Sequence, residues 1–323
     1  MTKLGPIVTA LLLSITACKD TVSVQGDGET SSGSGSGGNA GSTSSGGICA
    51  VSACSDLDWA NWPIPSAPGE GKPNPVSYEL GDGVAVDSVT GLMWQRDAAP
   101  GTYTLEMAKA YCTSSAVAGF SDWRLPTRIE LVSIVDDTAV NPAINATVFP
   151  DTPEDYTWTS TPLFVDSAGV WSVHFAGYEY YSNAADTSNQ QPARCVRGGV
   201  AAPSCRYSAT DTTVLDTATK LTWQRNVDPG QYTWADAKAY CDTLTLDGGG
   251  WRLPAVKELL SLIDLCRTYP VVNPEVFPDT PAELFWSGTL VAGGPANAWF
   301  VYFGEGNADS HEVSTLSFAR CVR

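Results

Sequence analysis

The sequence contains few charged residues and, among them, few basic ones. Charged side chains make up 16% of the 323 residues, and 18 Lys and Arg stand against 35 Asp and Glu, for a formal net charge of −17. A chain this acidic repels phosphate backbones and has no basic stripe, so no nucleic-acid partner is expected. The same imbalance disfavours strongly sulfated polymers, unless local basic patches or bridging cations intervene.

Catalytic motifs are missing as well. The chain contains no G-x-S-x-G, no H-E-x-x-H, no P-loop and no G-x-G-x-x-G that opens a helix. Its two histidines, His174 and His311, do not occupy corresponding positions of the repeat described below, which argues against a shared histidine mechanism. The sequence therefore predicts no catalytic residues, no cofactor and no metal site.

Long apolar runs are absent except at the N-terminus, where residues 7–15 are too short to span a bilayer stably. The run ends in "ITAC", which resembles the lipobox of bacterial lipoproteins. The resemblance implies a signal peptide over residues 1–17 and acylation of Cys18, with outer-membrane lipid as the partner. Lys19 in place of Asp favours the outer membrane, at its periplasmic face or at the cell surface. The alternative is an ordinary secretory signal in which Cys18 plays no part.

Two segments precede the folded part of the chain. Residues 18–47 begin with the lipidated cysteine and continue as a Gly/Ser-rich stretch that cannot bury a core, so they are expected to act as a flexible tether. Residues 48–77 contain Cys49, Cys54 and many prolines. They are expected to form an irregular lead-in, with a Cys49–Cys54 bond closing a loop.

The rest of the chain is a tandem repeat. "GLMWQR" returns as "KLTWQR", "DWRLP" returns as "GWRLP", and "AKAYC", "FPDTP" and "RCVR" each occur twice, at separations of 126 to 129 residues. The period is far longer than that of a solenoid, which indicates two whole domains. We expect them over residues 78–199 and 200–323.

Each copy reads as α+β. "YTLEMAKAYC" and "YTWADAKAYC" are typical of a short helix, and a second helix follows the WRLP element. In the first copy Thr127 and Glu130 form a T-x-x-E capping box, whereas the second copy has Ala255 at the capping position and should lose about 1 kcal/mol there. Several short, irregular antiparallel strands are expected before and after the helices.

The repeated residues are mostly aromatic, proline and cysteine, which fill cores and fix turns. Each WRLP arginine has a glutamate six residues later, so the ion pairs Arg124–Glu130 and Arg252–Glu258 are predicted; the alternative is an arginine that binds ligand directly.

Eight cysteines remain once Cys18 is assigned to the lipid, an even number that favours disulfides in an exported chain, with free thiols or a metal site as alternatives. The repeated positions, on a helix and on the last strand, predict Cys112–Cys195 and Cys241–Cys321. Cys205 and Cys266 occur only in the second copy and are expected to pair with each other.

Taken in order, "TGLMWQR", "YTLEMAKAYC", "DWRLPTRIEL", "FPDTP" and "RCVR" resemble the Lcl C-terminal domain family, named after a collagen-like bacterial adhesin. The resemblance covers about residues 80–197 and 207–323. It implies two tandem C-type-lectin-like domains, in the branch that includes formylglycine-generating enzymes, and an exported or lipid-anchored protein. The named member binds host glycans.

Two departures from these relatives bear on function. Formylglycine-generating enzymes use a cysteine pair for copper and oxygen chemistry, whereas the cysteines here have helix-to-strand positions suited to structural bonds. Calcium-dependent lectins use Glu-Pro-Asn or Gln-Pro-Asp motifs, whereas this chain has "QPA" and "NPE". We therefore expect a non-catalytic adhesion or binding protein for an unknown glycan or protein ligand, with two copies on a tether raising avidity.

The alternatives are a relative of the formylglycine-generating oxidases and a purely structural envelope lipoprotein. The loops between "FPDTP" and "RCVR" differ most between the copies, which makes them the predicted contact region. The candidate ligand-binding residues there are Tyr178, Tyr180, Tyr181, Asn307 and His311.

Overall fold

The computed structural model describes residues 48–50, 59–68, 72–163, 169–177, 182–203 and 205–323. The predicted signal peptide, Cys18 and the tether lie outside these residues, as do Cys54 and the candidate tyrosines Tyr178, Tyr180 and Tyr181. The predicted Cys49–Cys54 bond is therefore also outside the described part of the chain.

The described chain folds as an α+β protein, as predicted, and both repeats build the same succession of elements, except that the first also contains η1 and β8. The lead-in contributes β1 (Ile48–Ala50). The first repeat contains β2 (Tyr78–Leu80), β3 (Val84–Asp87), β4 (Met93–Gln95), α1 (Leu105–Ser114), the 3-10 helix η1 (Val117–Gly119), α2 (Arg128–Ser133), β5 (Tyr156–Pro162), β6 (Gly169–His174), β7 (Ser182–Asp186) and β8 (Val196–Arg197). The second contains β9 (Tyr207–Ala209), β10 (Thr213–Asp216), β11 (Thr222–Gln224), α3 (Trp234–Asp242), α4 (Val256–Leu260), β12 (Leu284–Val291), β13 (Gly294–Tyr302) and β14 (Ala308–Glu312).

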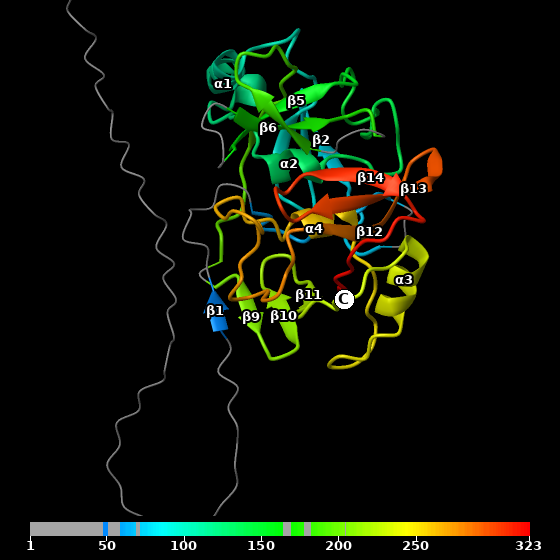
Figure 1. Cartoon of the computed structure of the whole chain (residues 1–323). Helices are drawn as coiled ribbons and strands as arrows, with labels where there is room; N and C mark the ends of the chain where they lie inside the picture. Colours follow the sequence, from blue (N-terminus) through cyan, green and yellow to red (C-terminus); the bar gives the residue numbers. More distant parts are fainter. Residues whose placement is uncertain (1–47, 51–58, 69–71, 164–168, 178–181, 204) are drawn as a thin grey trace, which may run out of the picture.

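The strands of the two repeats join in one sheet. Each repeat has its own small sheet, in the order β2-β3-β4-β8 in the first and β1-β9-β10-β11 in the second. A further sheet has the order β12-β13-β14-β7-β6-β5, so each repeat supplies three neighbouring strands. The two sets meet where Ala308 of β14 pairs with Ser182 of β7, and Figure 1 shows β5 and β6 above β14, β13 and β12.

The hydrophobic core is also shared. One buried cluster combines Trp94 and Phe149 of the first repeat with Trp223 and Phe277 of the second. Two smaller clusters belong to one repeat each and surround its helix-to-strand cysteines. Because most of the buried aromatic surface lies in the shared cluster, separating the repeats would expose it to water.

Buried cations reinforce the contact between the repeats. Helix α2 packs against α4. The guanidinium of Arg128, which is fully buried on α2, donates from Nη1 to the carbonyl of Gly306 at 2.8 Å. In the opposite direction, the ammonium of Lys257 on α4 donates to the carbonyl of Val135. The sequence predicts two lectin-like domains, and the structure fuses them into one body.

The lead-in, predicted as irregular, is part of this body. Strand β1 pairs with β9 at the edge of the second repeat's small sheet. Farther along, Trp59, Trp62 and Ile64 are buried in the shared core. The lead-in therefore begins against the second repeat and then runs between the two repeats before the first one starts.

Helix capping differs between the copies at one position. Thr127 and Glu130 form the predicted capping box of α2. At α4 Ala255 has no side-chain oxygen, but Glu258 Oε2 still accepts from the Ala255 backbone N–H at 2.7 Å. Half of the box therefore survives in the second repeat, and the missing half is the hydroxyl.

Restoring that hydroxyl should stabilise the protein. Ala255→Ser is expected to raise the free energy of unfolding by about 1 kcal/mol, because a serine Oγ can accept from the Glu258 backbone N–H. Chemical denaturation followed by tryptophan fluorescence measures the change. Thr127→Ala is the matched control and should lower the free energy of unfolding by a similar amount; an unchanged or lower value for Ala255→Ser would contradict the prediction.

A second difference concerns two equivalent buried carboxylates, Asp87 and Asp216. Asp216 forms a buried ion pair with Arg206 at 2.8 Å. The position that corresponds to Arg206 in the first repeat is Ser77, which bonds to Ser88 instead. Asp87 accepts from the backbone N–H groups of Val89 and Thr90, and burial nevertheless raises its pKa. The first repeat thus buries a carboxylate without the arginine that the second repeat supplies.

This carboxylate gives the protein a pH-dependent weakness. Because folding raises the pKa of Asp87 above its ordinary value of 3.8, the folded chain binds its proton more tightly, and stability is lost as pH rises through the folded pKa. Asp87→Asn is expected to raise the free energy of unfolding at pH 7 and to leave it nearly unchanged at pH 3. Denaturant titrations at several pH values test this. An increase in the free energy of unfolding that is as large at pH 3 as at pH 7 would contradict the prediction.

Candidate ligand-binding site

The repeated WRLP element places its tryptophan and leucine in the core of each repeat. Trp123 and Leu125 are buried, and the Trp123 indole donates to the Val117 carbonyl at 3.2 Å. In the second repeat Trp251 donates likewise to Leu246 at 2.9 Å. The element is held rigidly, so the arginine between these two side chains has a fixed position.

Both predicted ion pairs are confirmed. Arg124 bonds to the two carboxylate oxygens of Glu130 at 2.7 and 2.6 Å, and Arg252 bonds to those of Glu258 at 2.7 Å each. The hydrogen bonds that Arg124 donates to Glu130 raise the pKa of Arg124, against the opposing effect of burial. Such two-point pairing fixes the plane of the guanidinium as well as its charge.

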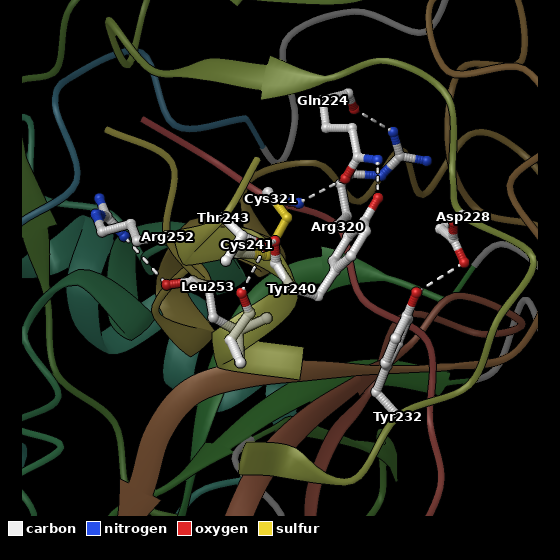
Figure 2. The surroundings of a disulfide bond; sticks show 11 residues. Gln224, Asp228, Tyr232, Tyr240, Cys241, Thr243, Arg252, Leu253, Arg320 and Cys321 are labelled. Carbon is white, nitrogen blue, oxygen red and sulfur yellow. Dashed lines mark hydrogen bonds between the residues drawn. A yellow bond between two sulfur atoms is a disulfide. The ribbon is translucent and has the colours of Figure 1, made fainter. Parts of the chain in front are cut away.

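The disulfides of the two repeats are present as predicted. Cys112–Cys195 and Cys241–Cys321 join the first helix of each repeat to its last segment, with Cα atoms 5.5 and 5.4 Å apart. Figure 2 shows the surroundings of the second bond. There Gln224 accepts from the Cys321 backbone N–H at 3.1 Å and donates to the Tyr240 hydroxyl at 2.7 Å.

The predicted Cys205–Cys266 bond is wrong. Cys205 is disulfide-bonded, whereas Cys266 does not belong to a disulfide. The reason is the sheet order: the strand beside β9, which Cys205 closely precedes, is β1 of the lead-in. Cys266 instead lies in a turn after α4, where its backbone N–H donates to Asp264 at 3.2 Å.

Sequence reasoning missed the role of the first arginine in each "RCVR". Arg194 and Arg320 are buried, and each guanidinium donates to two carbonyls of the "WQR" motif and to the threonine of "FPDTP". Each also lies over the phenylalanine of "FPDTP", Phe149 at 5.0 Å and Phe277 at 4.8 Å. Burial lowers the pKa of Arg194 to about 10 and that of Arg320 to about 9. These distant motifs recur together because they meet around one buried cation.

A pocket of about 850 Å³ opens beside the first WRLP element. Five parts of the chain line it: residues 59–62 of the lead-in, α1, the stretch from Arg124 to Glu130, Ser160 of β5, and residues 198–203, which connect the repeats. Arg252, the counterpart of Arg124, is not among its lining residues. The two repeats share the ion pair but differ in what surrounds it.

The lead-in wall of the pocket is anchored to the second repeat. The Arg206 guanidinium lies over the Trp59 ring at 4.3 Å and donates to the carbonyl of Ala60 at 3.0 Å. Arg206 is itself fixed by its ion pair with Asp216. Trp59 also contacts the Tyr207 ring edge-on. The pocket therefore depends on the fusion of both repeats, although its charged residues come from the first.

The charged side chains of the pocket leave more hydrogen-bond donors than acceptors available. Arg124 donates two N–H groups to Glu130 and a third to the carbonyl of Gly198. Its Nε–H and one Nη1–H remain available, and 40% of its side chain is exposed. Among the described residues, Lys109 on α1 pairs only with the exposed Glu106. By contrast, both oxygens of Glu130 already accept hydrogen bonds, one from Arg124 and the other from Arg124 and the Thr127 backbone.

The local charge differs from that of the whole chain. Among the lining residues Arg124 and Lys109 are cationic and Glu130 is anionic, so the pocket is slightly positive in a protein with a net charge of −17. Asn61 adds an amide whose Oδ1 is buried and receives no hydrogen bond from the described residues. Tryptophan walls with a few polar groups are typical of a ligand site of this volume.

The other candidates from the sequence lie elsewhere. His311 is on β14, where its ring packs edge-on against Phe300 at 4.6 Å. Asn307 precedes β14, its backbone carbonyl accepts from Tyr302 at 2.9 Å, and its side-chain Oδ1 is buried. Neither residue lines the pocket, and a role for them in ligand contact stays a prediction.

The described ranges contain neither a metal-ligand cluster nor a membrane-spanning helix. No group of three or more His, Cys, Asp or Glu in the described chain is placed to hold a metal ion. None of the helices in those ranges has the length and apolar character needed to cross a bilayer.

A family model described as the Lcl C-terminal domain matches residues 83–197 and, a second time, residues 212–323. Each match starts at the equivalent strand, β3 or β10, and ends at "RCVR". No curated protein matches the chain. Two walls of the pocket, residues 59–62 and 198–203, lie outside both matched regions.

Proposed function

The chain belongs to the Lcl C-terminal domain family through both of its repeats, and we propose that it is a non-catalytic binding protein whose ligand site is the pocket beside Arg124. The family indicates a protein of the cell surface or the cell envelope. The observation that carries the proposal is the pocket itself: tryptophan walls, an arginine fixed by Glu130 and a further cation at the rim.

The arrangement of the repeats changes how avidity would arise. Two independent domains on a tether would raise avidity by effective concentration. Here the repeats share a sheet and a core, so any two contact surfaces have a fixed separation and orientation. The tether then serves to hold one rigid body away from the membrane.

We further propose that Cys18 is acylated and anchors the protein in the outer membrane. The lipobox-like "ITAC" and the following Lys19 support this address. Growth of the expressing cells with a labelled fatty acid should label the full chain and leave Cys18→Ala unlabelled. Protease or antibody access on intact cells then separates the cell surface from the periplasmic face.

Binding is tested with the full chain, purified in mild detergent, on a panel of glycans and of envelope and host surface proteins. We expect one ligand class to bind and to protect the tryptophans at the pocket from fluorescence quenching. No binding across the panel would count against the proposal and favour a structural envelope component.

An oxidase of the formylglycine-generating type is the rival class. The cysteines that recur in both repeats form disulfides, which supports a structural role for them. Cys266 carries a thiol, so a thiol count alone does not decide between the classes. The sharper test is copper binding: the proposal expects no stoichiometric Cu(I) bound to the chain, and retention of one equivalent that Cys266→Ala abolishes would favour the oxidase.

A further inference from the structure

Residues 199–203 form a pocket wall whose backbone is unpaired. They follow β8 after Gly198, and residues 199–202 are exposed. Within the described part of the chain, none of their backbone N–H or C=O groups makes a hydrogen bond. An exposed run of unpaired backbone groups is a template on which another extended chain can add as a strand.

The cationic side chains beside this segment favour an anionic acceptor on the ligand. Arg124 has an Nε–H and an Nη1–H beyond those that it gives to Glu130 and Gly198. Lys109, which is 43% exposed, stands on α1 at the same pocket. A carboxylate is the group that matches an arginine donor fork beside an ammonium.

The same inventory disfavours a saccharide. Sugar hydroxyls need acceptors as well as donors, yet the only carboxylate among the lining residues, Glu130, already accepts three hydrogen bonds from Arg124 and the Thr127 backbone, and the Oδ1 of Asn61 is buried. The remaining acceptors in the pocket are the hydroxyls of Thr113, Thr127 and Ser160 and the backbone carbonyls of residues 199–203. Beside those carbonyls, residues 199–202 add backbone N–H groups that are unpaired within the described chain, and an extended polypeptide offers both kinds of partner along its backbone.

We propose that the pocket beside Arg124 binds an extended peptide segment that carries a carboxylate. The peptide backbone pairs with residues 199–203, the carboxylate reaches Arg124 and Lys109, and an apolar side chain packs against Trp62. This rests on the proposed binding function and names its ligand class. Residues 59–62 and 198–203 lie outside the family matches, whereas Arg124 and Lys109 lie within the first match, so the site combines residues of the first repeat with segments that flank it.

The experiment uses the full chain and two probe sets: random heptapeptides with a free C-terminal carboxylate, and an array of neutral and uronic-acid oligosaccharides. Peptides rich in Asp or Glu should bind, and Lys109→Gln should weaken them by about threefold or more, since an opposite charge is lost at a partly exposed site. Amidation of a binder whose only carboxylate is its C-terminus should weaken binding by a similar factor.

Two proline variants test the strand pairing. Proline removes a backbone donor, and because successive N–H groups of a strand point to opposite sides, only one of Ala201→Pro and Ala202→Pro should weaken peptide binding, by about tenfold. Ala201→Ser and Ala202→Ser keep the donor and should bind as the parent does. Melting curves identify any proline variant that fails to fold. The other proline variant is then compared with its serine control.

The outcomes separate this inference from the function on which it rests. Peptide binding that neither proline variant changes would overturn strand addition. Oligosaccharide binding that depends on Arg124, without peptide binding, would overturn the peptide ligand and leave the binding function standing. If neither probe set nor the wider panel binds, both the peptide ligand and the proposed binding function would be overturned.

Discussion

Replacing Cys241 and Cys321 together with alanine is expected to lower the free energy of unfolding by about 4–5 kcal/mol. The bond closes a loop with a sequence separation of 80 residues, and the chain-entropy model assigns a closure of that length an effect of this size. Both cysteines are fully buried among Trp251, Trp286 and Phe300, so loss of the sulfur atoms adds a packing cost.

The form of the transition matters as much as its midpoint. Because the repeats share a sheet and the larger part of the core, both the parent and the double variant should unfold in one transition. Denaturant titration followed by fluorescence and near-ultraviolet circular dichroism measures this. Cys112→Ala with Cys195→Ala is the matched control in the first repeat, with a separation of 83 residues. Two resolved transitions, or a shift confined to one probe, would contradict a fused body.

Contacts whose residues occur in both copies of the repeat were predictable from the sequence. The ion pairs Arg124–Glu130 and Arg252–Glu258 join residues six positions apart across one turn and the start of a helix, so local spacing was enough to find them. The cysteine pairs follow because a helix and a closing strand recur with both partners. In each case the second copy confirmed which residues of the first belong together.

Features that the copies do not share were hidden from the same reasoning. Arg128 and Lys257, which join the repeats, have Val256 and Ile129 at their counterpart positions, so no comparison of the copies singles them out. The pocket is built partly from residues 59–62 and 198–203, which belong to neither repeated motif. Cys205 was mispaired for the same reason, since its neighbouring strand comes from the lead-in.

The repeated arginines of "RCVR" form an intermediate case. Their recurrence was visible, but a buried cation that is bonded to carbonyls and a hydroxyl has no oppositely charged partner to reveal its place. The only available signal was that "WQR", "FPDTP" and "RCVR" occur together in both copies, which could have indicated that the three motifs meet. Repetition alone shows that residues matter together and does not show whether they hold the fold or face a ligand.

Arg124 and Arg252 allow that distinction to be made by experiment. The two ion pairs match closely: the N–O distances are 2.6 and 2.7 Å, and the arginine side chains are 40% and 31% exposed. Arg124→Gln and Arg252→Gln should therefore cost similar stability, about 1–3 kcal/mol each, because a largely buried glutamate loses its partner. Only Arg124 lines the pocket.

Ligand binding should respond to one of the two replacements. With the ligand selected from the binding panel, Arg124→Gln is expected to raise the Kd about tenfold or more, equivalent to about 1.4 kcal/mol, since the pocket loses the donors that face the ligand. Arg252→Gln should leave the Kd within about twofold of the parent value. Isothermal titration calorimetry on both variants, at a temperature where each is folded, supplies the comparison. Equal weakening by the two variants would mean that the WRLP arginine serves the fold alone, because loss of stability would then be its only effect.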